Sequence, residues 1–235
     1  MDKKLTKIRD IVDNSGLDFF QFLDGIFNDD LKAVINELQY HSEVYLFSGI
    51  IRNYFLNIKE HRDVDLVLSK EVDVARFFNG FPIKRNSFGG FKIQLDSVDV
   101  DLWFMKNTWA FQYGQKTLDL QLEKKIPDTA FFNFSSVIYC INSKRFFYTD
   151  HFLRFLRDKK LDYVDRINAN YGLCVVNTFY YADKYSLKVS ERLLKLIREF
   201  HTHKKYDYQS IQLKHFGKVL YDDLSISNRL DNNIT

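Results

Sequence analysis

Hydrophobic and polar positions divide the chain into a first part with mixed patterns and a second part with a helical pattern. Residues 3–14 and 29–40 carry apolar side chains every three or four positions, which predicts amphipathic helices. Between residues 44 and 104, short apolar runs and strict alternation predict strands. From about residue 150 onward the helical spacing returns. This order favours an α+β fold, in which a mixed sheet with flanking helices is followed by a small helical unit.

The predicted strands are short and are separated by turn residues. They cover residues 44–47, 62–68, 83–88, 91–95 and 98–104. Helical spacing is found between them at residues 50–56 and 71–79, and later at residues 152–156, 175–185 and 191–200. Residues 117–122 and 131–141 show no clear period, so no element is assigned to them.

Two predicted strands carry pairs of aspartates on one face. Because successive side chains of a strand point to opposite faces, Asp63 and Asp65 share a face, and so do Asp99 and Asp101. Like charges roughly 7 Å apart along a strand are costly to bury without a cation. A divalent metal and a solvated strand edge are both compatible with the first pair, and the second pair can add a third carboxylate.

The first predicted strand ends at Ser48-Gly49, where small residues allow a tight turn into the segment 50–56. The start of a helix can receive a phosphate, although a plain connection between strand and helix has the same composition. Arg52 lies in this helical segment, and the aspartate pair follows it. The order of turn, basic helix and carboxylates indicates a site for a nucleotide and a metal.

The amino-acid composition limits the classes of protein to which the chain can belong. The chain has 235 residues, of which 46% are hydrophobic and 28% charged, so it is globular rather than disordered. A net charge of +3 permits a nucleic-acid partner without requiring one. Cys140 and Cys174 have apolar neighbours and no metal-ligand spacing, so buried thiols are expected. No apolar run approaches about 18 residues, and the charged N-terminus lacks the apolar stretch of a leader. We expect a soluble, cytoplasmic protein without a membrane partner.

Three segments, taken in order, resemble the nucleotidyltransferase superfamily that includes DNA polymerase β. They are Ser48-Gly49-Ile50-Ile51-Arg52-Asn53, Asp63-Val64-Asp65, and Asp101 in the sequence VDLW. The resemblance is greatest to the head domain of tRNA CCA-adding enzymes and bacterial poly(A) polymerases. The family's first motif is Gly-Gly, any residue, Val-Arg-Asp, and here Ser48, Ile51 and Asn53 replace the first glycine, the valine and the aspartate. The motif of two aspartates is unchanged.

A second resemblance, over residues 173–200, is to the helical neck that follows the head in those enzymes. The residues in similar places are Ala182, Lys184, Leu187 and Val189. Val176 and Asn177 stand where the family tends to have arginines. The family's Arg-Arg-Asp motif aligns with Phe131-Phe132-Asn133, and the Glu-Asp-x-x-Arg motif that selects C and A is not found. The resemblance covers about residues 40–200 and does not favour a CCA-adding activity.

The sequence pattern and the resemblance together divide the chain into four parts. They are an N-terminal helical segment at residues 1–40, a nucleotidyltransferase head at 41–145, a helical neck-like domain at 146–221 and a flexible tail at 222–235.

The resemblance also implies a chemistry. Asp63, Asp65 and Asp101 would be catalytic and would hold two Mg²⁺ ions, with Mn²⁺ as a substitute. Ser48, Gly49, Arg52 and Lys92 would contact the nucleotide, for which ATP is expected. The expected reaction moves a nucleoside monophosphate onto a hydroxyl of an RNA 3′ end or of a small molecule.

Three alternatives stay open at this point. Asp99 lies on the same face as Asp101 and could replace it, although in the family the third aspartate precedes an apolar and an aromatic residue, as Asp101 does here. Arg52 could bind phosphate or could have a structural role inside the head. The whole protein could be a catalytically weak module that binds a nucleotide or a partner, because the charges of the Arg-Arg-Asp motif are lost.

Overall fold

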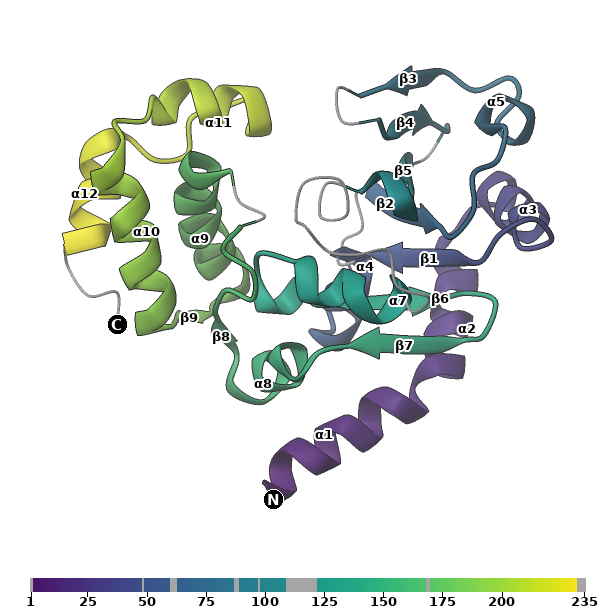
Figure 1. Ribbon diagram of the computed structural model, residues 1–235, viewed down its shortest axis with the longest axis horizontal. Coiled ribbons are helices and arrows are strands. Elements are labelled where there is room, and N and C mark those ends of the chain that lie inside the picture. The colour runs from purple at the N-terminus through teal and green to yellow at the C-terminus, as the bar shows by residue number, and fades with distance from the viewer. Residues whose placement is uncertain are drawn as a thin grey trace.

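A computed structural model describes most of the chain, and Figure 1 shows it as two lobes. The described residues are 2–47, 49–59, 63–86, 89–96, 98–108, 122–167 and 170–231. One lobe contains a sheet with its helices, and the other contains the helices near the C-terminus. The predicted α+β architecture with a mixed sheet is therefore confirmed.

The described part of the sheet lobe contains a seven-stranded sheet with the order β3-β4-β5-β2-β1-β6-β7. Its strands are β1 Val44–Phe47, β2 Asp63–Leu68, β3 Ile83–Arg85, β4 Phe91–Gln94, β5 Asp99–Phe104, β6 Val137–Cys140 and β7 Arg145–Tyr148. Strands β2 and β5 run parallel, and the other neighbouring pairs run antiparallel. Strand β6 lies within the segment 131–141, to which the sequence pattern assigns no element. All four of its residues are buried, so it lacks the alternation that identifies a strand.

Helices from the N-terminal part pack on one face of the sheet. They are α1 Lys3–Asn14, α2 Gly16–Ile26, α3 Asp29–Leu38, α4 Gly49–Phe55 and the short α5 Val74–Phe77. Helix α2 is additional to the predicted elements, and Phe19 on it makes an edge-to-face contact with Tyr139 of β6 at 4.7 Å between ring centroids. The Tyr139 hydroxyl donates a hydrogen bond of 2.8 Å to the carbonyl oxygen of Gly16. These contacts fix α2 against the sheet.

The two faces of the central strands have different environments. The side chains of Val64, Leu66, Val100 and Leu102 are at most 2% exposed and belong to the main hydrophobic core with the helices. On the opposite face, a smaller apolar cluster covers the later part of the strands, beside the short helices α7 Leu122–Lys125, η1 Met105–Asn107 and η2 Ile126–Thr129. That cluster consists of Tyr45, Val67, Met105, Ile126, Ile138 and Cys140. The beginnings of β2 and β5 lie outside it.

The second lobe is helical, as the spacing predicts. It consists of α9 Tyr171–Tyr185, α10 Glu191–His203, α11 Tyr208–Phe216 and α12 Asp223–Asp231. Helix α8 Asp150–Asp158 and the short parallel pair β8 Lys160–Leu161 and β9 Lys188–Val189 connect it to the sheet lobe. The short helix η3 Asn133–Ser135 lies between β5 and β6 in the chain. It also belongs to this connection, because Phe134 on η3 contacts the ring of Tyr181 on α9.

Helix α12 differs from the predicted flexible tail. Its residues Ile226 and Leu230 are 0% and 2% exposed, and Arg229 forms an ion pair of 2.9 Å with Asp183 of α9. Two apolar residues four positions apart lie on the same side of a helix, so they can pack together against α10. In a polar sequence they form only a weak hydrophobic pattern. Residues 232–235 of the predicted tail lie outside the described residues.

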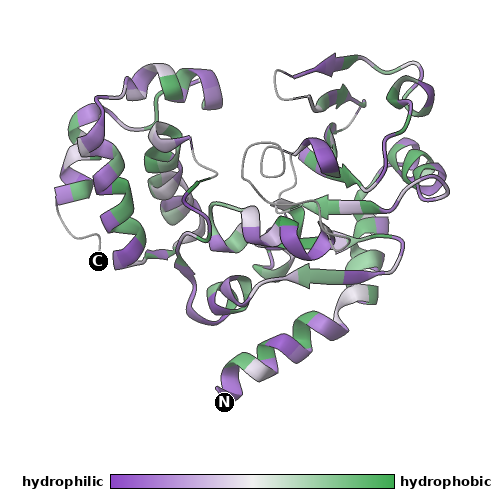
Figure 2. Ribbon diagram, in the orientation of Figure 1, coloured by the Kyte–Doolittle hydropathy of each residue, from purple (hydrophilic) through white to green (hydrophobic). Residues whose placement is uncertain are grey.

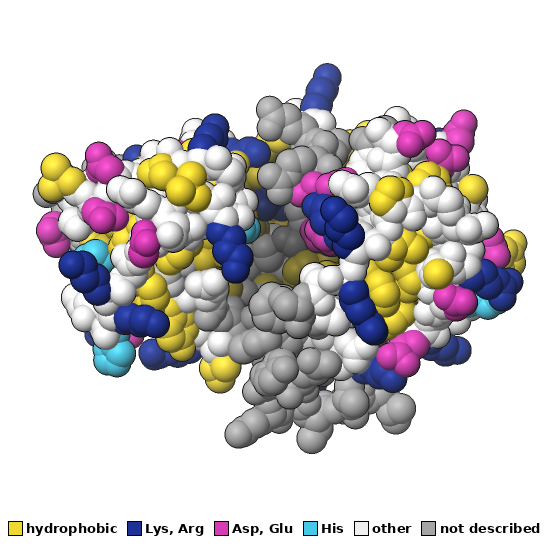
Figure 3. All heavy atoms as spheres, turned by 90° about the horizontal axis from the view of Figure 1, so that it is seen from above, with side chains coloured by type: hydrophobic (Ala, Val, Ile, Leu, Met, Phe, Trp, Pro, Cys, Tyr) yellow, Lys and Arg dark blue, Asp and Glu magenta, His cyan; other side chains and the backbone are white. Residues whose placement is uncertain are grey.

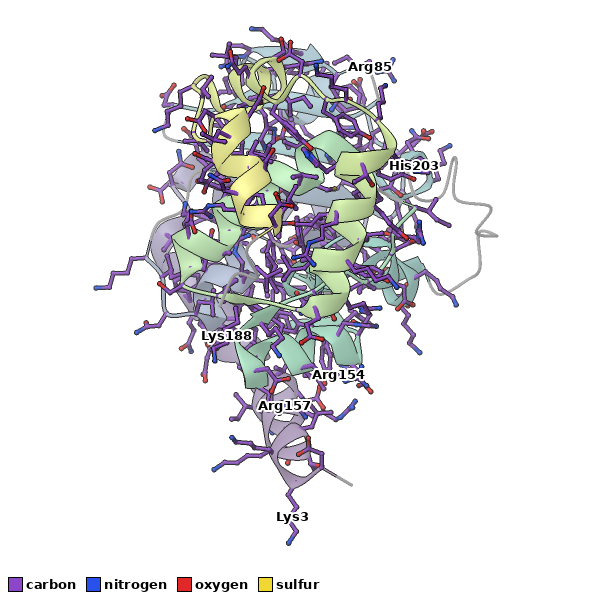
Figure 4. All side chains as sticks on the ribbon, turned by 90° about the vertical axis from the view of Figure 1, so that its left-hand side faces the viewer. Lys3, Arg85, Arg154, Arg157, Lys188 and His203 are labelled. Atoms are coloured by element: carbon purple, nitrogen blue, oxygen red, sulfur yellow. The ribbon has the colours of Figure 1, made fainter. Side chains whose placement is uncertain are left out.

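The outer helices expose polar residues, and no helix among the described residues is long and apolar enough to cross a membrane. Figure 2 shows hydrophobic and hydrophilic residues alternating along α1, as in a helix with one side in solvent. This helix projects from the rest of the protein, and Lys3 lies at its outer end (Figure 4). Cys140 and Cys174 are buried free thiols, as predicted, and burial raises the pKa of the Cys174 thiol to about 12.

Candidate functional site

Two pairs of aspartates come together at the beginnings of β2 and β5. The parallel register places Asp63 opposite Asp99 and Asp65 opposite Asp101. All four are partly exposed, whereas Val64 and Val100 between them are buried, so the four carboxylates lie on the face away from the main core. Neighbouring strands are about 4.8 Å apart, which concentrates four negative charges in a small area. We call Asp63, Asp65, Asp99 and Asp101 the aspartate face.

Lys92 brings a positive charge to the aspartate face from β4. It stands directly opposite Asp101 in the antiparallel register of β4 and β5, so its side chain shares that face. Its ammonium nitrogen lies 2.9 Å from Oδ2 of Asp99. The hydrogen bond with Asp99 raises the pKa of Lys92, and the charges of Asp101, Asp99 and Asp63 act in the same direction, against a smaller effect of burial. Lys92 is therefore held as a cation beside the carboxylates.

In the space-filling view of Figure 3, acidic and basic side chains lie next to each other on the sheet lobe, on the side that faces the helical lobe. The strands β3, β4 and β5 lie on the upper side of the sheet lobe in Figure 1.

The strand that leads into the predicted phosphate turn pairs with one of the two strands of the aspartate face. Strand β1 runs antiparallel to β2, with Leu46 opposite Leu66, so the chain leaves β1 beside the beginning of β2. Gly49 then starts α4. Ser48, the other residue predicted for this turn, lies outside the described residues. Gly49 thus follows the end of the strand that pairs with β2, on which Asp63 and Asp65 lie.

Arg52, which the family resemblance assigns to the nucleotide, has a different environment. It is only 8% exposed, and its Nε and Nη2 each donate a hydrogen bond of 3.1 Å to Oδ1 of Asn53. Its guanidinium carbon lies 4.5 Å from the ring centroid of Tyr185, 4.8 Å from that of Phe134 and 5.7 Å from that of Tyr181. This placement supports the structural alternative, in which Arg52 joins α4 to α9 through a cage of aromatic rings.

The segment that aligns with the Arg-Arg-Asp motif is also a connection between the lobes. Phe131, Phe132 and Asn133 are all buried. The Asn133 amide donates a hydrogen bond of 2.9 Å to the carbonyl oxygen of Lys160, and its Oδ1 accepts one of 3.0 Å from the backbone of Asp162. Where the family has charges for a nucleotide, this chain therefore has apolar rings and an amide that pairs with backbone.

Asn177 on α9, at a place where the family tends to have arginine, has a buried polar atom. Its Oδ1 is inaccessible to solvent and has no hydrogen-bond partner within the described part of the chain. A buried carbonyl oxygen without a donor costs free energy. The sequence shows that an arginine is replaced here, but it does not show that the amide oxygen is buried.

The aspartate face fits a divalent cation in its type of donor. Carboxylate oxygens are the ligands that Mg²⁺ and Mn²⁺ prefer. Among residues that the structure describes, no three or more His, Cys, Asp or Glu side chains are gathered closely enough to hold a metal ion. The strands supply the right chemical groups in register, and side-chain rotation would be needed to bring their oxygens around one ion.

No protein-family model matches the sequence, and no curated protein matches it. Solved structures do match the fold. A CCA-adding enzyme in complex with ATP aligns with a TM-score of 0.60 and 15% identity, over 97% of this chain and 53% of that one. A tRNA nucleotidyltransferase complexed with a primer tRNA and an incoming ATP analog aligns with a TM-score of 0.55 and 15% identity, over 73% and 50%. The Thermotoga maritima CCA-adding enzyme complexed with tRNA gives a TM-score of 0.58 and 14% identity, over 97% and 52%.

These alignments define the class of fold. The chain has an α+β fold similar to that of tRNA nucleotidyltransferases, and more particularly of CCA-adding enzymes, as the motifs predict. It spans about half the length of these structures.

Proposed function

We propose that the protein is a metal-dependent nucleotidyltransferase, which moves a nucleoside monophosphate from an NTP onto a hydroxyl acceptor. The observation that carries this proposal is the register of β2 and β5, which aligns Asp63 with Asp99 and Asp65 with Asp101 within a fold similar to that of tRNA nucleotidyltransferases. Of these residues, Asp63, Asp65 and Asp101 match the carboxylate motifs of that class in the sequence.

In this proposal Asp63, Asp65 and Asp101 hold two divalent ions, Mg²⁺ or Mn²⁺. When bound, such ions neutralise the triphosphate and make the acceptor hydroxyl more acidic. The backbone at Gly49 would contact phosphate, and its position at the start of α4, shortly after β1, supports this role. Lys92 supplies a cation on the same face.

The proposed reaction is a substitution at the α-phosphorus. The acceptor oxygen forms a bond to that phosphorus, the bond to the oxygen that bridges to the β-phosphate breaks, and pyrophosphate leaves. The hydroxyl proton passes to the carboxylate of Asp101. The chain thus contributes alignment, electrostatic stabilisation and a proton acceptor.

The nucleotide and the acceptor are proposed from the related structures. The solved proteins with this fold include complexes with ATP, with CTP and with tRNA. We propose ATP as the nucleotide and an RNA 3′ hydroxyl as the acceptor, with a small molecule as the alternative acceptor.

Calorimetry tests the binding part of the proposal. Mg²⁺ with a non-hydrolysable ATP analogue is titrated into the parent protein and into the Asp63→Ala and Asp65→Ala variants. The parent is expected to bind, and each variant is expected to lose at least about tenfold in affinity, because a charge-assisted contact to a cation contributes more than about 1.4 kcal/mol. Lys84→Met, on the exposed strand β3, is the control for a general change in charge. Equal affinity of the parent and both aspartate variants would show that the carboxylates do not hold the metal and nucleotide.

A second candidate function is a binding module that retains the fold and has little catalytic activity. The burial of Phe131, Phe132 and Asn133 favours it, because the charges that the family uses at this motif are replaced by apolar and amide groups. Such a module would bind Mg²⁺ and the nucleotide but would not transfer a label from it to any RNA.

A further inference from the structure

Exposed basic residues gather where helix α8 and the short strands β8 and β9 connect the two lobes. They are Arg154, Lys159, Lys160 and Lys188, and we call them the joint patch. In Figure 4 the labelled side chains of Arg154 and Lys188 lie in the same lower part of the molecule. None of the four forms an ion pair within the described part of the chain.

The aspartates of the same segment are already paired with arginines. Residues 150–162 contain three acidic side chains. The ion pairs are Asp150 with Arg9 at 2.8 Å, Asp158 with Arg157 at 2.7 Å and Asp162 with Arg192 at 3.2 Å. The hydrogen bond from Arg157 is the main reason why the pKa of Asp158 is lowered. The negative charges near the joint patch are thus compensated by other cations, and the patch keeps its positive charge.

The register of β8 and β9 places two cations of the joint patch side by side. Lys160 stands opposite Lys188 in this parallel pair, and both are exposed. Leu161 and Val189, which follow them, are 0% and 7% exposed, so the two lysines share the outer face. Like charges on neighbouring strands repel each other, so this arrangement is unfavourable for the fold alone. An anionic ligand would remove the repulsion.

The composition of the joint patch favours one kind of anionic partner. The large apolar side chains that are exposed in the described part of the chain lie outside α8, β8, β9 and α10. Proteins bind a membrane surface through apolar side chains together with cations. The phosphate backbone of a nucleic acid, in contrast, is bound mainly by cations that replace its counter-ions. A surface with cations and without exposed apolar side chains therefore fits a phosphate backbone.

We infer that the joint patch binds the phosphate backbone of an RNA and forms a contact separate from the aspartate face. In Figure 1, α8, β8 and β9 lie below β2 and β5, on the side toward the helical lobe. The patch thus holds a part of the RNA away from its reacting 3′ end. The choice of RNA as the nucleic acid rests on the proposed function.

Fluorescence anisotropy with a labelled single-stranded RNA, without Mg²⁺ or nucleotide, tests this surface in the whole protein. The triple variant Arg154→Gln, Lys160→Gln and Lys188→Gln is expected to bind at least about tenfold more weakly than the parent. The slope of log K against log salt concentration is expected to fall by about 2, because each lost phosphate contact removes about 0.7. Lys159 is kept, because its φ of 49° belongs to the C-cap of α8.

A matched control removes the same charge from another surface of the helical lobe. The exposed lysines Lys204, Lys214 and Lys218 lie on α11 or beside it, and α11 is at the top of this lobe in Figure 1. Their triple replacement by Gln is expected to keep the RNA affinity within about twofold at about 0.15 M salt, where distant charges are screened.

Two acceptors of different length separate the joint patch from the proposed catalysis. A dinucleotide has one linking phosphate, which lies at the reacting end. The triple variant of the joint patch is therefore expected to transfer label to a dinucleotide like the parent. With a long RNA, its KM is expected to rise at least about fivefold with an unchanged kcat, because the lost contact contributes to binding alone.

Four results would overturn the inference. They are absence of RNA binding by the parent, equal RNA affinity in the parent and the triple variant, an equal loss in the control, and a lower midpoint of thermal unfolding in the triple variant. The last would show that the cations stabilise the fold, whereas relief of their repulsion predicts a midpoint at least as high as that of the parent.

Phosphatidylserine vesicles provide the test for a membrane partner. Binding of the parent to these vesicles that is tighter than to RNA, and is lost in the triple variant, would assign the joint patch to a membrane and contradict the inference. RNA binding that depends on the patch, without transfer of label to any RNA, would contradict the proposed function and support the RNA-binding surface, so the two failures are distinguishable.

Discussion

Arg52, which the family resemblance assigns to the nucleotide, makes buried contacts that stabilise the fold. Its guanidinium donates two hydrogen bonds to Asn53 and lies among the rings of Phe134, Tyr181 and Tyr185. Arg52→Met is expected to lower the free energy of unfolding by about 2 to 3 kcal/mol, because it removes two buried hydrogen bonds and the contacts of the cation with three aromatic rings. Urea unfolding measures this change.

The control for Arg52 is Arg154 on α8, which is exposed and lies at the edge of the molecule in Figure 4. Arg154→Met is expected to change the free energy of unfolding by at most about 0.5 kcal/mol. A cost for Arg52→Met no greater than that for Arg154→Met would mean that the aromatic cage contributes nothing to stability.

The sequence is enough to identify the candidate carboxylates, but it is not enough to assign a role to each of them. Alternation along one strand is a local property, so it is enough to place Asp63 with Asp65 and Asp99 with Asp101 on common faces. The ion pair of Lys92 with Asp99 joins two strands, so it depends on the register of β4 and β5 and not on a local pattern. The cage of Arg52 comes from residues far away in the chain, so no local pattern could reveal it.

Helix α2 contains two glycines in opposite environments, which provide a matched test of its packing. A Cβ atom on Gly16 would lie 2.1 Å from the backbone oxygen of Lys144, whereas one on Gly25 would meet nothing within 4 Å. Gly16→Ala is expected to cost about 1 to 3 kcal/mol in stability, because the backbone must move, and Gly25→Ala to add up to about 1 kcal/mol through helix propensity. Urea unfolding of both variants checks the difference, and a loss of stability in neither would refute the close packing of α2 against the β6–β7 turn.

The packing of helix α12 on the helical lobe can be tested in the same way. Leu230 is 2% exposed and Leu224 is 70% exposed, although both belong to the same helix. Leu230→Ala is expected to lower the thermal stability by the equivalent of about 2 to 4 kcal/mol, and Leu224→Ala to have almost no effect. Equal, small effects of the two substitutions would support the flexible tail that the polar sequence predicts.

Elements with one buried and one exposed face are easier to predict from the sequence than elements that are buried on both faces or almost entirely exposed. Strands β2 and β5 alternate between buried and partly exposed residues over most of their length, and the sequence places them within a residue or so. Strand β6 is buried on both sides, and α12 has two buried apolar residues, Ile226 and Leu230, in a polar segment. Neither pattern has a clear period, because the period arises only where one face is buried and the other is solvated.

At the scale of the whole molecule, the two lobes are joined by buried groups rather than by a polar linker. Arg52 connects α4 to α9, and Asn133 hydrogen-bonds to the backbone of Lys160 and Asp162. The positions that the family uses for nucleotide charges thus hold the lobes together here. The aspartate face lies on β2 and β5, so the proposed catalysis belongs to the sheet lobe.

The proposed nucleotidyl transfer is tested most directly with α-³²P-labelled ATP, Mg²⁺ and a pool of RNA with free 3′ hydroxyls. The measured quantity is the transfer of label to the RNA. The proposed function predicts labelled RNA and pyrophosphate with the parent protein. With Asp65→Asn it predicts a rate lower by on the order of 10²-fold or more, and with EDTA it predicts no transfer. If no nucleotide labelled any RNA although the parent bound Mg²⁺ and the ATP analogue, the protein would be a binding module and the proposed transfer to RNA would be wrong.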